Sequence, residues 1–165
     1  MKNITFIFFL LSVLSFQTVK GQNEKFKALF IYNFTNYIEW PSNEGRTFLV
    51  AVLGDSPIIN EIEAISKIKT IGKLPIEVRR INSTSEIGNA SIVYVPPSKK
   101  KVLAELSQIL VGKPVLIISD GAVGNFGINF VEISQKQSYQ ISKSNIESHG
   151  LKVNSNLIAL GTAVN

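Results

Sequence analysis

The sequence contains no cysteine, which excludes disulfide bonds, a catalytic thiol and a lipid-anchored N-terminal cysteine. A domain without disulfides has to be stabilised by its hydrophobic core, and 165 residues with 45% apolar content suffice for one such core. Histidine is nearly absent as well, because His149 is the single one. Since a zinc site needs several histidine or cysteine ligands, no metal centre is expected.

Motifs for catalysis and for nucleotide binding are also missing. A serine–histidine–aspartate arrangement would have to use His149, and no G-x-S-x-G sequence is present. We expect His149 to contact the last carbonyls of a helix that ends at Gly150. Neither the three-glycine dinucleotide pattern nor a P-loop occurs. We therefore predict no catalytic residues and no cofactor.

Arginine is scarce, and the formal net charge is only +5. A nucleic-acid-binding protein usually carries a denser basic face, often with interleaved aromatic side chains. The sole cationic run, residues 99–101, is expected to face solvent in the first turn of a helix. Nucleic acid is therefore not an expected partner.

The longest hydrophobic run lies at the N-terminus. Lys2 precedes an almost unbroken apolar stretch over residues 4–16, and small residues around Gly21 offer a cleavage site, which is the pattern of a secretory signal peptide. The stretch is too short to span a bilayer, which takes about 20 residues. We predict a signal peptide over residues 1–21 and one exported domain over residues 22–165, with no membrane insertion of the mature chain.

Strand and helix patterns alternate along the remaining chain. Continuous apolar runs predict central strands, a more polar run predicts an edge strand, and two segments around a short turn predict an antiparallel hairpin. The expected fold is a single α/β domain, a three-layer sandwich whose mostly parallel sheet of about six strands is closed by the C-terminal hairpin. The expected strands are residues 47–53, 76–81, 91–95, 114–119, 127–133 and 138–141.

An unusually apolar stretch, residues 25–41, opens the expected mature domain. Its apolar side chains are three and four residues apart, which predicts a helix that runs to Trp40 and is stopped by Pro41. Lys27 lies on the narrow polar edge of this helix, and the rest of the circumference is apolar enough to require cover on more than one side. Two interpretations of Trp40 stay open, a half-buried core side chain and a contact for a dimer or another partner.

Asp55 and Asp120 are the only aspartates, and each directly follows a predicted strand. The carboxyl ends of parallel strands lie at one edge of the sheet, where the ligand clefts of α/β proteins form. The two carboxylates are therefore candidates to share a cleft for a cation or a polar ligand, whereas the alternative is that both serve only turns and caps. Phe126, a large apolar residue in a glycine-containing loop, is either part of the core or an exposed contact.

Several stretches resemble the YfiR family and together cover residues 25 to 161. The resemblance implies a periplasmic α/β domain without enzymatic activity, often a homodimer. It also implies a partner, an inner-membrane signalling protein such as a diguanylate cyclase or a sensor kinase. In the best-known system the protein binds the periplasmic region of the cyclase, so cyclic di-GMP and biofilm formation rise when the repressor is lost. The stretches are KALFIYNFTNYIEWP, FLVAVLGDSP, VYVP, VLIISD, GINFVEI and HGLKVNSNLIAL.

The chain departs from the family pattern at some positions. The lack of cysteine means that no redox switch of the family can be assigned to this chain, and Gln140 stands where the family usually has an acidic residue.

Two function hypotheses follow from the sequence. The first is a periplasmic regulator that binds and inhibits the sensor region of a membrane signalling protein. The alternative is a small-molecule-binding or small hydrolytic domain that uses the cleft near Asp55 and Asp120.

Overall fold

The computed structural model describes residues 16–41 and 46–165, which form five α-helices, two 3-10 helices and ten strands. The helices are α2 (Phe16–Phe34), α3 (Ile58–Ser66), η1 (Thr84–Glu86), η2 (Pro97–Val102), α4 (Leu103–Ile109), α5 (Lys143–Ser148) and α6 (Ser155–Leu160). The strands are β1 (Ile38–Glu39), β2 (Phe48–Leu53), β3 (Thr70–Ile71), β4 (Leu74–Ile81), β5 (Ile92–Val95), β6 (Leu116–Asp120), β7 (Ile128–Ile133), β8 (Lys136–Ile141), β9 (Lys152–Val153) and β10 (Thr162–Ala163). The predicted signal peptide lies largely outside the described residues.

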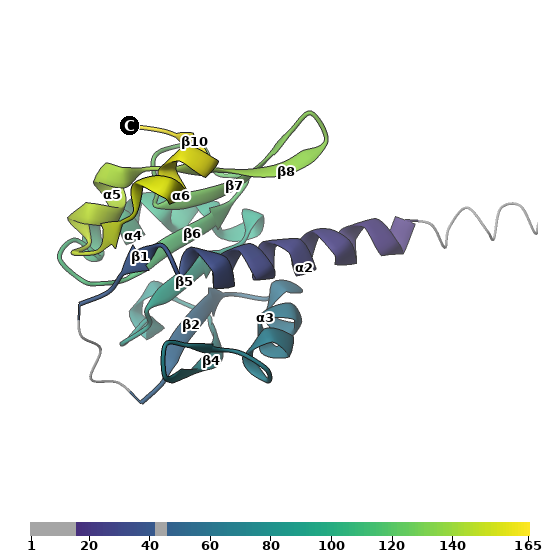
Figure 1. Cartoon of the computed structure of the whole chain (residues 1–165), viewed down its shortest axis with the longest axis horizontal. Coiled ribbons are helices and arrows are strands. Elements are labelled where there is room, and N and C mark those ends of the chain that lie inside the picture. The colour runs from purple at the N-terminus through teal and green to yellow at the C-terminus, as the bar shows by residue number, and fades with distance from the viewer. Residues whose placement is uncertain (1–15, 42–45) are drawn as a thin grey trace, which may run out of the picture.

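An eight-stranded sheet with the order β10-β8-β7-β6-β5-β2-β4-β3 forms the centre of the domain (Figure 1). The strands β4, β2, β5, β6 and β7 are parallel, and β8 returns antiparallel to β7. The two-residue strands β3 and β10 extend the edges. The predicted mixed, mostly parallel sheet with a C-terminal antiparallel hairpin is therefore confirmed.

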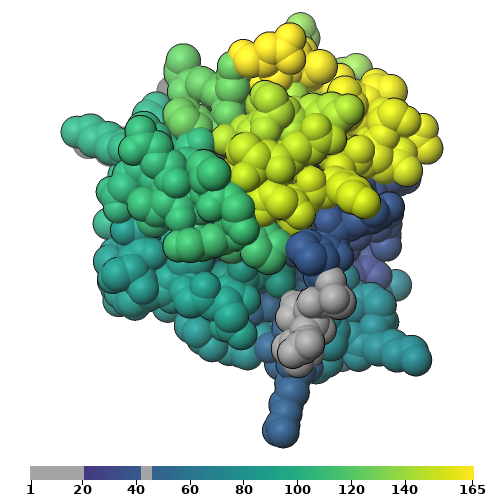
Figure 2. All heavy atoms as spheres, turned by 90° about the vertical axis from the view of Figure 1, so that its left-hand side faces the viewer, coloured from purple at the N-terminus to yellow at the C-terminus, as the bar shows by residue number. Residues whose placement is uncertain are grey.

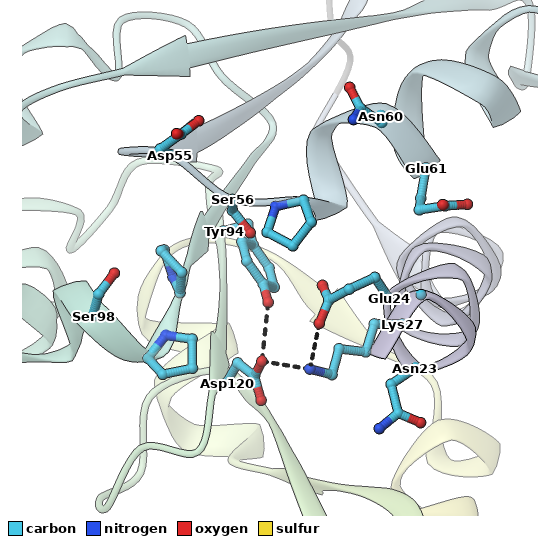
Figure 3. A pocket seen from close by; sticks show the side chains of 14 residues that line it. Asn23, Glu24, Lys27, Asp55, Ser56, Asn60, Glu61, Tyr94, Ser98 and Asp120 are labelled. Atoms are coloured by element: carbon cyan, nitrogen blue, oxygen red, sulfur yellow. Dashed lines mark hydrogen bonds and ion pairs between the residues drawn. The ribbon is translucent and has the colours of Figure 1, made fainter. Parts of the chain in front are cut away.

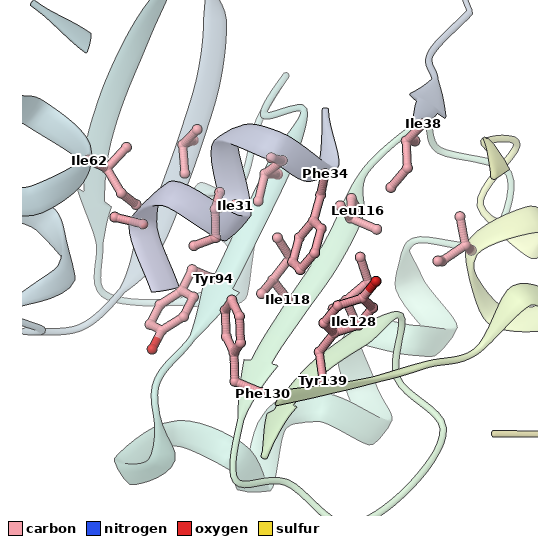
Figure 4. Close-up of a cluster of buried hydrophobic side chains, with 14 of the residues drawn as sticks. Ile31, Phe34, Ile38, Ile62, Tyr94, Leu116, Ile118, Ile128, Phe130 and Tyr139 are labelled. Carbon is pink, nitrogen blue, oxygen red and sulfur yellow. The ribbon is translucent and has the colours of Figure 1, made fainter. Parts of the chain in front are cut away.

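Side chains of the central strands alternate between two hydrophobic cores, one on each face of the sheet. Val50 and Val52 of β2 belong to the core that α2 and α3 cover, whereas Leu49 and Ala51 belong to the core beneath η1 and α4. Every residue of β2 is buried, as expected for a strand with helices on both faces. Figure 4 shows the first core, where Phe34 of α2 lies over the sheet between helix and strands. The predicted three layers are thus present.

The helix at the start of the domain differs from the prediction at both ends, and it begins at Phe16 rather than Lys25. It ends at Phe34 rather than Trp40, and a turn closed by the bond from the Tyr37 N–H to the Phe34 carbonyl leads into β1. Strand β1 pairs antiparallel with β9, so Ile38 gains backbone partners that a longer helix would not offer. Figure 2 shows this end of the molecule, where the C-terminal residues in yellow lie beside the segment that follows α2. The pairing of β1 with β9 therefore ends the helix earlier than the helical spacing of the apolar side chains predicts.

Helix α2 is the longest element of the fold. Its C-terminal half packs on the sheet and on α3, while its N-terminal half projects past the edge where β2, β5 and β6 end (Figure 1). Within the described ranges, no helix combines the length and apolarity that crossing a bilayer requires. The projecting half of α2 forms one wall of the cleft described next.

Candidate functional site

A cleft of about 560 Å³ opens at the carboxyl ends of β2, β5 and β6. The chain leaves β2 toward β4 on one side of the sheet, and it leaves β5 toward β6 on the other side. The cleft therefore lies at the point where the strand order reverses, the position at which open α/β sheets bind their ligands. Residues 21–27 of α2 and the start of α3 complete its walls (Figure 3).

The polar centre of the cleft is a cluster formed by Lys27, Asp120, Tyr94 and Glu24. The Lys27 ammonium donates to Asp120 Oδ2 at 2.6 Å and to Glu24 Oε1 at 3.0 Å. The Tyr94 hydroxyl donates to the same Asp120 oxygen at 3.2 Å. The side chains of Lys27 and Asp120 are only 9% and 15% exposed, so this is a largely buried ion pair. It connects α2 to the end of β6 across 93 residues of sequence.

Burial and neighbouring charges shift the pKa values of two members of this cluster. Burial by itself lowers the pKa of Lys27, but the hydrogen bonds and charges of Asp120 and Glu24 outweigh it and raise that pKa overall. The pKa of the Tyr94 hydroxyl is raised by burial first, and then by the charges of Asp120 and Glu24. At neutral pH, Lys27 is therefore a cation and Tyr94 a hydrogen-bond donor, both directed at Asp120.

Asp55 and Asp120 line the same cleft but have different surroundings. The Asp55 side chain is 88% exposed at the rim, and its one described partner is Arg80, at 3.4 Å. An exposed pair at this distance contributes little to stability. Asp120 is instead the acceptor at the centre of the buried cluster. The two carboxylates thus lie in one cavity, Asp120 as a structural anchor and Asp55 as a charge at the rim.

Trp40 is half-buried beside β2, at the end of the domain opposite the cleft. Its indole ring packs edge-on against Phe48, with the ring centroids 5.1 Å apart. The indole N–H donates to the carbonyl of Ser91 at 3.2 Å. These contacts give Trp40 a structural role. Because part of its side chain is exposed, a contact with a partner through Trp40 stays a proposal.

Phe126 is half-buried on the other face of the sheet, where its ring packs against the core that contains Leu49 and Ala51. The loop that carries it is held by Asn129, whose side chain bonds Ser119, Gln140 and both backbone groups of Ala122. Phe126 lies outside the cleft lining. A partner contact through its exposed part also remains a proposal.

His149 does not contact the last carbonyls of its own helix through its side chain, although the sequence predicted this contact. It follows α5 directly and is fully buried, but its Nδ1 atom pairs with the carbonyl of Val115 at 2.9 Å rather than with a carbonyl of its own helix. The bond attaches the end of α5 to the segment just before β6. The histidine is therefore a buried link between two elements, distant from the cleft.

Sequence reasoning missed Lys27, Tyr94 and Glu24 as site residues. Lys27 belongs to a helix whose other inward side chains are apolar, and this isolated lysine was a signal that could have been used. Tyr94 lies in a short apolar strand and looks like a core aromatic residue, which its ring is, since it is 1% exposed. Neither spacing nor composition indicates that both side chains reach the carboxylate of Asp120, because that contact depends on where α2 lies across the sheet.

A second hollow, of about 640 Å³, lies between the C-terminal half of α2, strand β8 and α6. We call it the α2–α6 groove. Among the residues that the structure describes, no charged side chain lines it, and its walls are aromatic and aliphatic with two asparagines. Leu160 at its border is 69% exposed, and Leu29 on α2 is 44% exposed. The lining residues are Phe30, Asn33, Phe34, Asn36, Tyr37, Tyr139, Leu157 and Leu160.

A family model described as YfiR/HmsC-like matches residues 24–162. The matched range begins in α2 and ends at the first residue of the edge strand β10, so it contains the other seven strands of the central sheet and most of the cleft. No curated protein matches the chain.

Proposed function

The chain belongs to the YfiR/HmsC-like family, and we propose that it is a periplasmic regulator that binds and inhibits the sensor region of an inner-membrane signalling protein. The family is a regulatory, non-catalytic one. We propose a diguanylate cyclase as the partner, so that binding lowers cyclic di-GMP, with a sensor kinase as the second choice. Export through the predicted signal peptide would deliver the domain to the compartment where the sensor region lies.

The observation that carries this proposal is the extent of the family match, which covers residues 24–162 and hence nearly the whole described domain. The α2–α6 groove supports it, because a largely apolar hollow with an exposed leucine, Leu160, at its border is typical of a protein-binding surface. The same groove suits a homodimer contact. Gel filtration of the purified chain distinguishes the two uses, because self-association would double the apparent mass in the absence of a partner.

Affinity purification from membranes tests the proposed partner. An exported, C-terminally tagged chain is expected to co-purify with one inner-membrane protein that has a cytoplasmic cyclase or kinase module. A version with one substitution in the groove, Leu160→Glu, serves as the matched control for contact through that surface. Recovery of no such membrane protein by the unsubstituted chain would contradict the proposal.

We expect Trp40→Ala to weaken partner binding by about thirtyfold or more, since truncation of an interface tryptophan costs roughly 2 kcal/mol or above. Isothermal titration with the partner's sensor region measures the change, and urea unfolding measures the accompanying loss of stability. Ile38→Ala is the control, because Ile38 is 5% exposed in the same segment and its truncation lowers stability without altering the surface. If both variants bind as tightly as the original chain, Trp40 is only a core residue.

A further inference from the structure

We propose that the outer edge of β4 is a dimerisation surface, on which β4 of a second copy of this chain pairs antiparallel about a twofold axis at Val78. This inference does not depend on the proposed regulation of a membrane protein, because both strands belong to this chain. It rests on the open edge of the strand, on the direction of its backbone groups and on the order of the charges along it.

Strand β4 lies at one side of the central sheet, away from α5 and α6 (Figure 1). On its inner side, the residues from Ile76 to Ile81 pair with β2. On its outer side, β3 pairs only with Leu74 and Pro75. No other strand that the structure describes continues this side, so the edge from Ile76 to Arg80 is open. An open edge of this length is a template for a further strand.

The direction of the backbone groups shows which residues of β4 could bond to that further strand. The Gly54 N–H donates to the Ile81 carbonyl at 2.7 Å, so the backbone groups of Ile81 face the side of β2. Backbone groups alternate in direction along a strand, and every second residue of β4 therefore presents its N–H and C=O to the open edge. These outward residues are Ile76, Val78 and Arg80. In the proposed dimer Val78 forms a hydrogen-bonded pair with Val78 of the second copy.

The charges on β4 make its edge complementary to itself. With Val78 on the axis, Glu77 of each copy lies directly opposite Arg79 of the other copy. This is a non-hydrogen-bonded pair, the type in which the side chains of antiparallel strands approach most closely. The two side chains are 41% and 47% exposed, so both are accessible to a second strand. Within one chain they form an exposed ion pair at 2.8 Å, which contributes little and is readily exchanged for the pair between copies.

Other antiparallel registers of β4 with itself are less favourable. An axis at Glu77 places two carboxylates opposite each other, and an axis at Arg79 or Arg80 places two guanidinium groups opposite each other. Like charges directly opposite destabilise a strand pair. An axis at Ile76 would bring the second strand onto Leu74, which already pairs with β3. The register at Val78 gives a self-complementary contact that closes after two copies.

Two charge-reversal variants, Glu77→Arg and Arg79→Glu, test the proposal by sedimentation equilibrium of the purified exported chain. The unsubstituted chain is expected to dimerise between about 1 μM and 1 mM, the range of weak to moderate affinities. Each single variant places like charges opposite each other in both pairs and should dimerise about tenfold or more weakly. The double variant exchanges the two charges and should dimerise as the unsubstituted chain does.

Mixing the two single variants in equal amounts is the sharpest test of the register. In the mixed dimer each arginine of one chain faces a glutamate of the other, so a heterodimer about as tight as the original dimer is expected. A mere loss of stability in either variant would not produce that dimer. Leu160→Glu, in the α2–α6 groove, is the control and should leave dimerisation unchanged.

Four results would overturn the proposal. They are no dimer of the unsubstituted chain below about 1 mM, single variants that dimerise as tightly as the unsubstituted chain, no heterodimer after mixing, and loss of the dimer in Leu160→Glu. The last result would assign the dimer to the α2–α6 groove. None of these results bears on the membrane partner, because the partner is absent from the experiment.

Discussion

Asp120→Asn is expected to lower the free energy of unfolding by about 3 kcal/mol, the typical cost of removing one charge from a buried ion pair. The substitution keeps the shape of the side chain but leaves the Lys27 ammonium, 9% exposed, with Glu24 as its remaining anionic partner. The Tyr94 hydroxyl also loses a charged acceptor. Urea unfolding followed by circular dichroism measures the change in stability.

Two further variants separate the ion pair from other effects at this position. Asp55→Asn removes the other aspartate of the cleft and should change stability by less than about 0.5 kcal/mol, because that side chain is 88% exposed. Lys27→Met combined with Asp120→Asn should recover at least half of the loss, since the buried uncompensated charge is then gone. If Asp120→Asn and Asp55→Asn lower the free energy of unfolding by equally small amounts, the ion pair of Lys27 with Asp120 does not stabilise the domain.

Gly127→Ala is expected to cost about 4 kcal/mol or more and to prevent accumulation of folded chain. Gly127 has φ +59°, and a Cβ there would collide with the backbone carbonyl oxygen of Ile117, which belongs to the adjacent strand and cannot move aside. The carbonyl of Gly127 also accepts from the Ser142 N–H at 2.8 Å, so a shift of the backbone would break a second contact. The yield of soluble protein and its thermal midpoint measure the effect.

Gly121→Ala provides the comparison for Gly127. Gly121 has φ +62°, nearly the same backbone conformation, but a Cβ there would meet no atom within 4 Å. It should therefore cost only the about 1–2 kcal/mol of placing an L-residue in the left-handed region. If the two alanine variants are equally stable, the close approach to Ile117 is not what makes Gly127 necessary.

The sheet could be predicted from the sequence because its central strands are buried on both faces. Continuous apolar runs such as that of β2, bounded by glycine and proline, leave few alternatives to a parallel strand under helices. The strand around Ile38 could not be predicted, because the helical spacing of its side chains indicates a helix. The segment pairs instead with β9, which lies more than 100 residues further along the chain. The edge strands β3 and β10 have two residues each and no pattern of their own.

The candidate site was predictable only to the level of strand ends. Asp55 and Asp120 could be placed at one edge of the sheet because parallel strands share their direction. Their separate roles, one exposed at the rim and one buried against Lys27, depend on the path of α2 across that edge. The sequence of α2 indicates which face is apolar but contains nothing that determines the angle at which the helix crosses the sheet.

Cellular cyclic di-GMP measured before and after deletion of the gene tests the central proposal most directly. Deletion is expected to raise the level severalfold, and expression of the exported chain in trans should restore it, whereas a chain without residues 1–21 should not. Biofilm mass should follow the same order. Unchanged cyclic di-GMP after deletion, with the membrane cyclase present and active, would contradict the proposed inhibition.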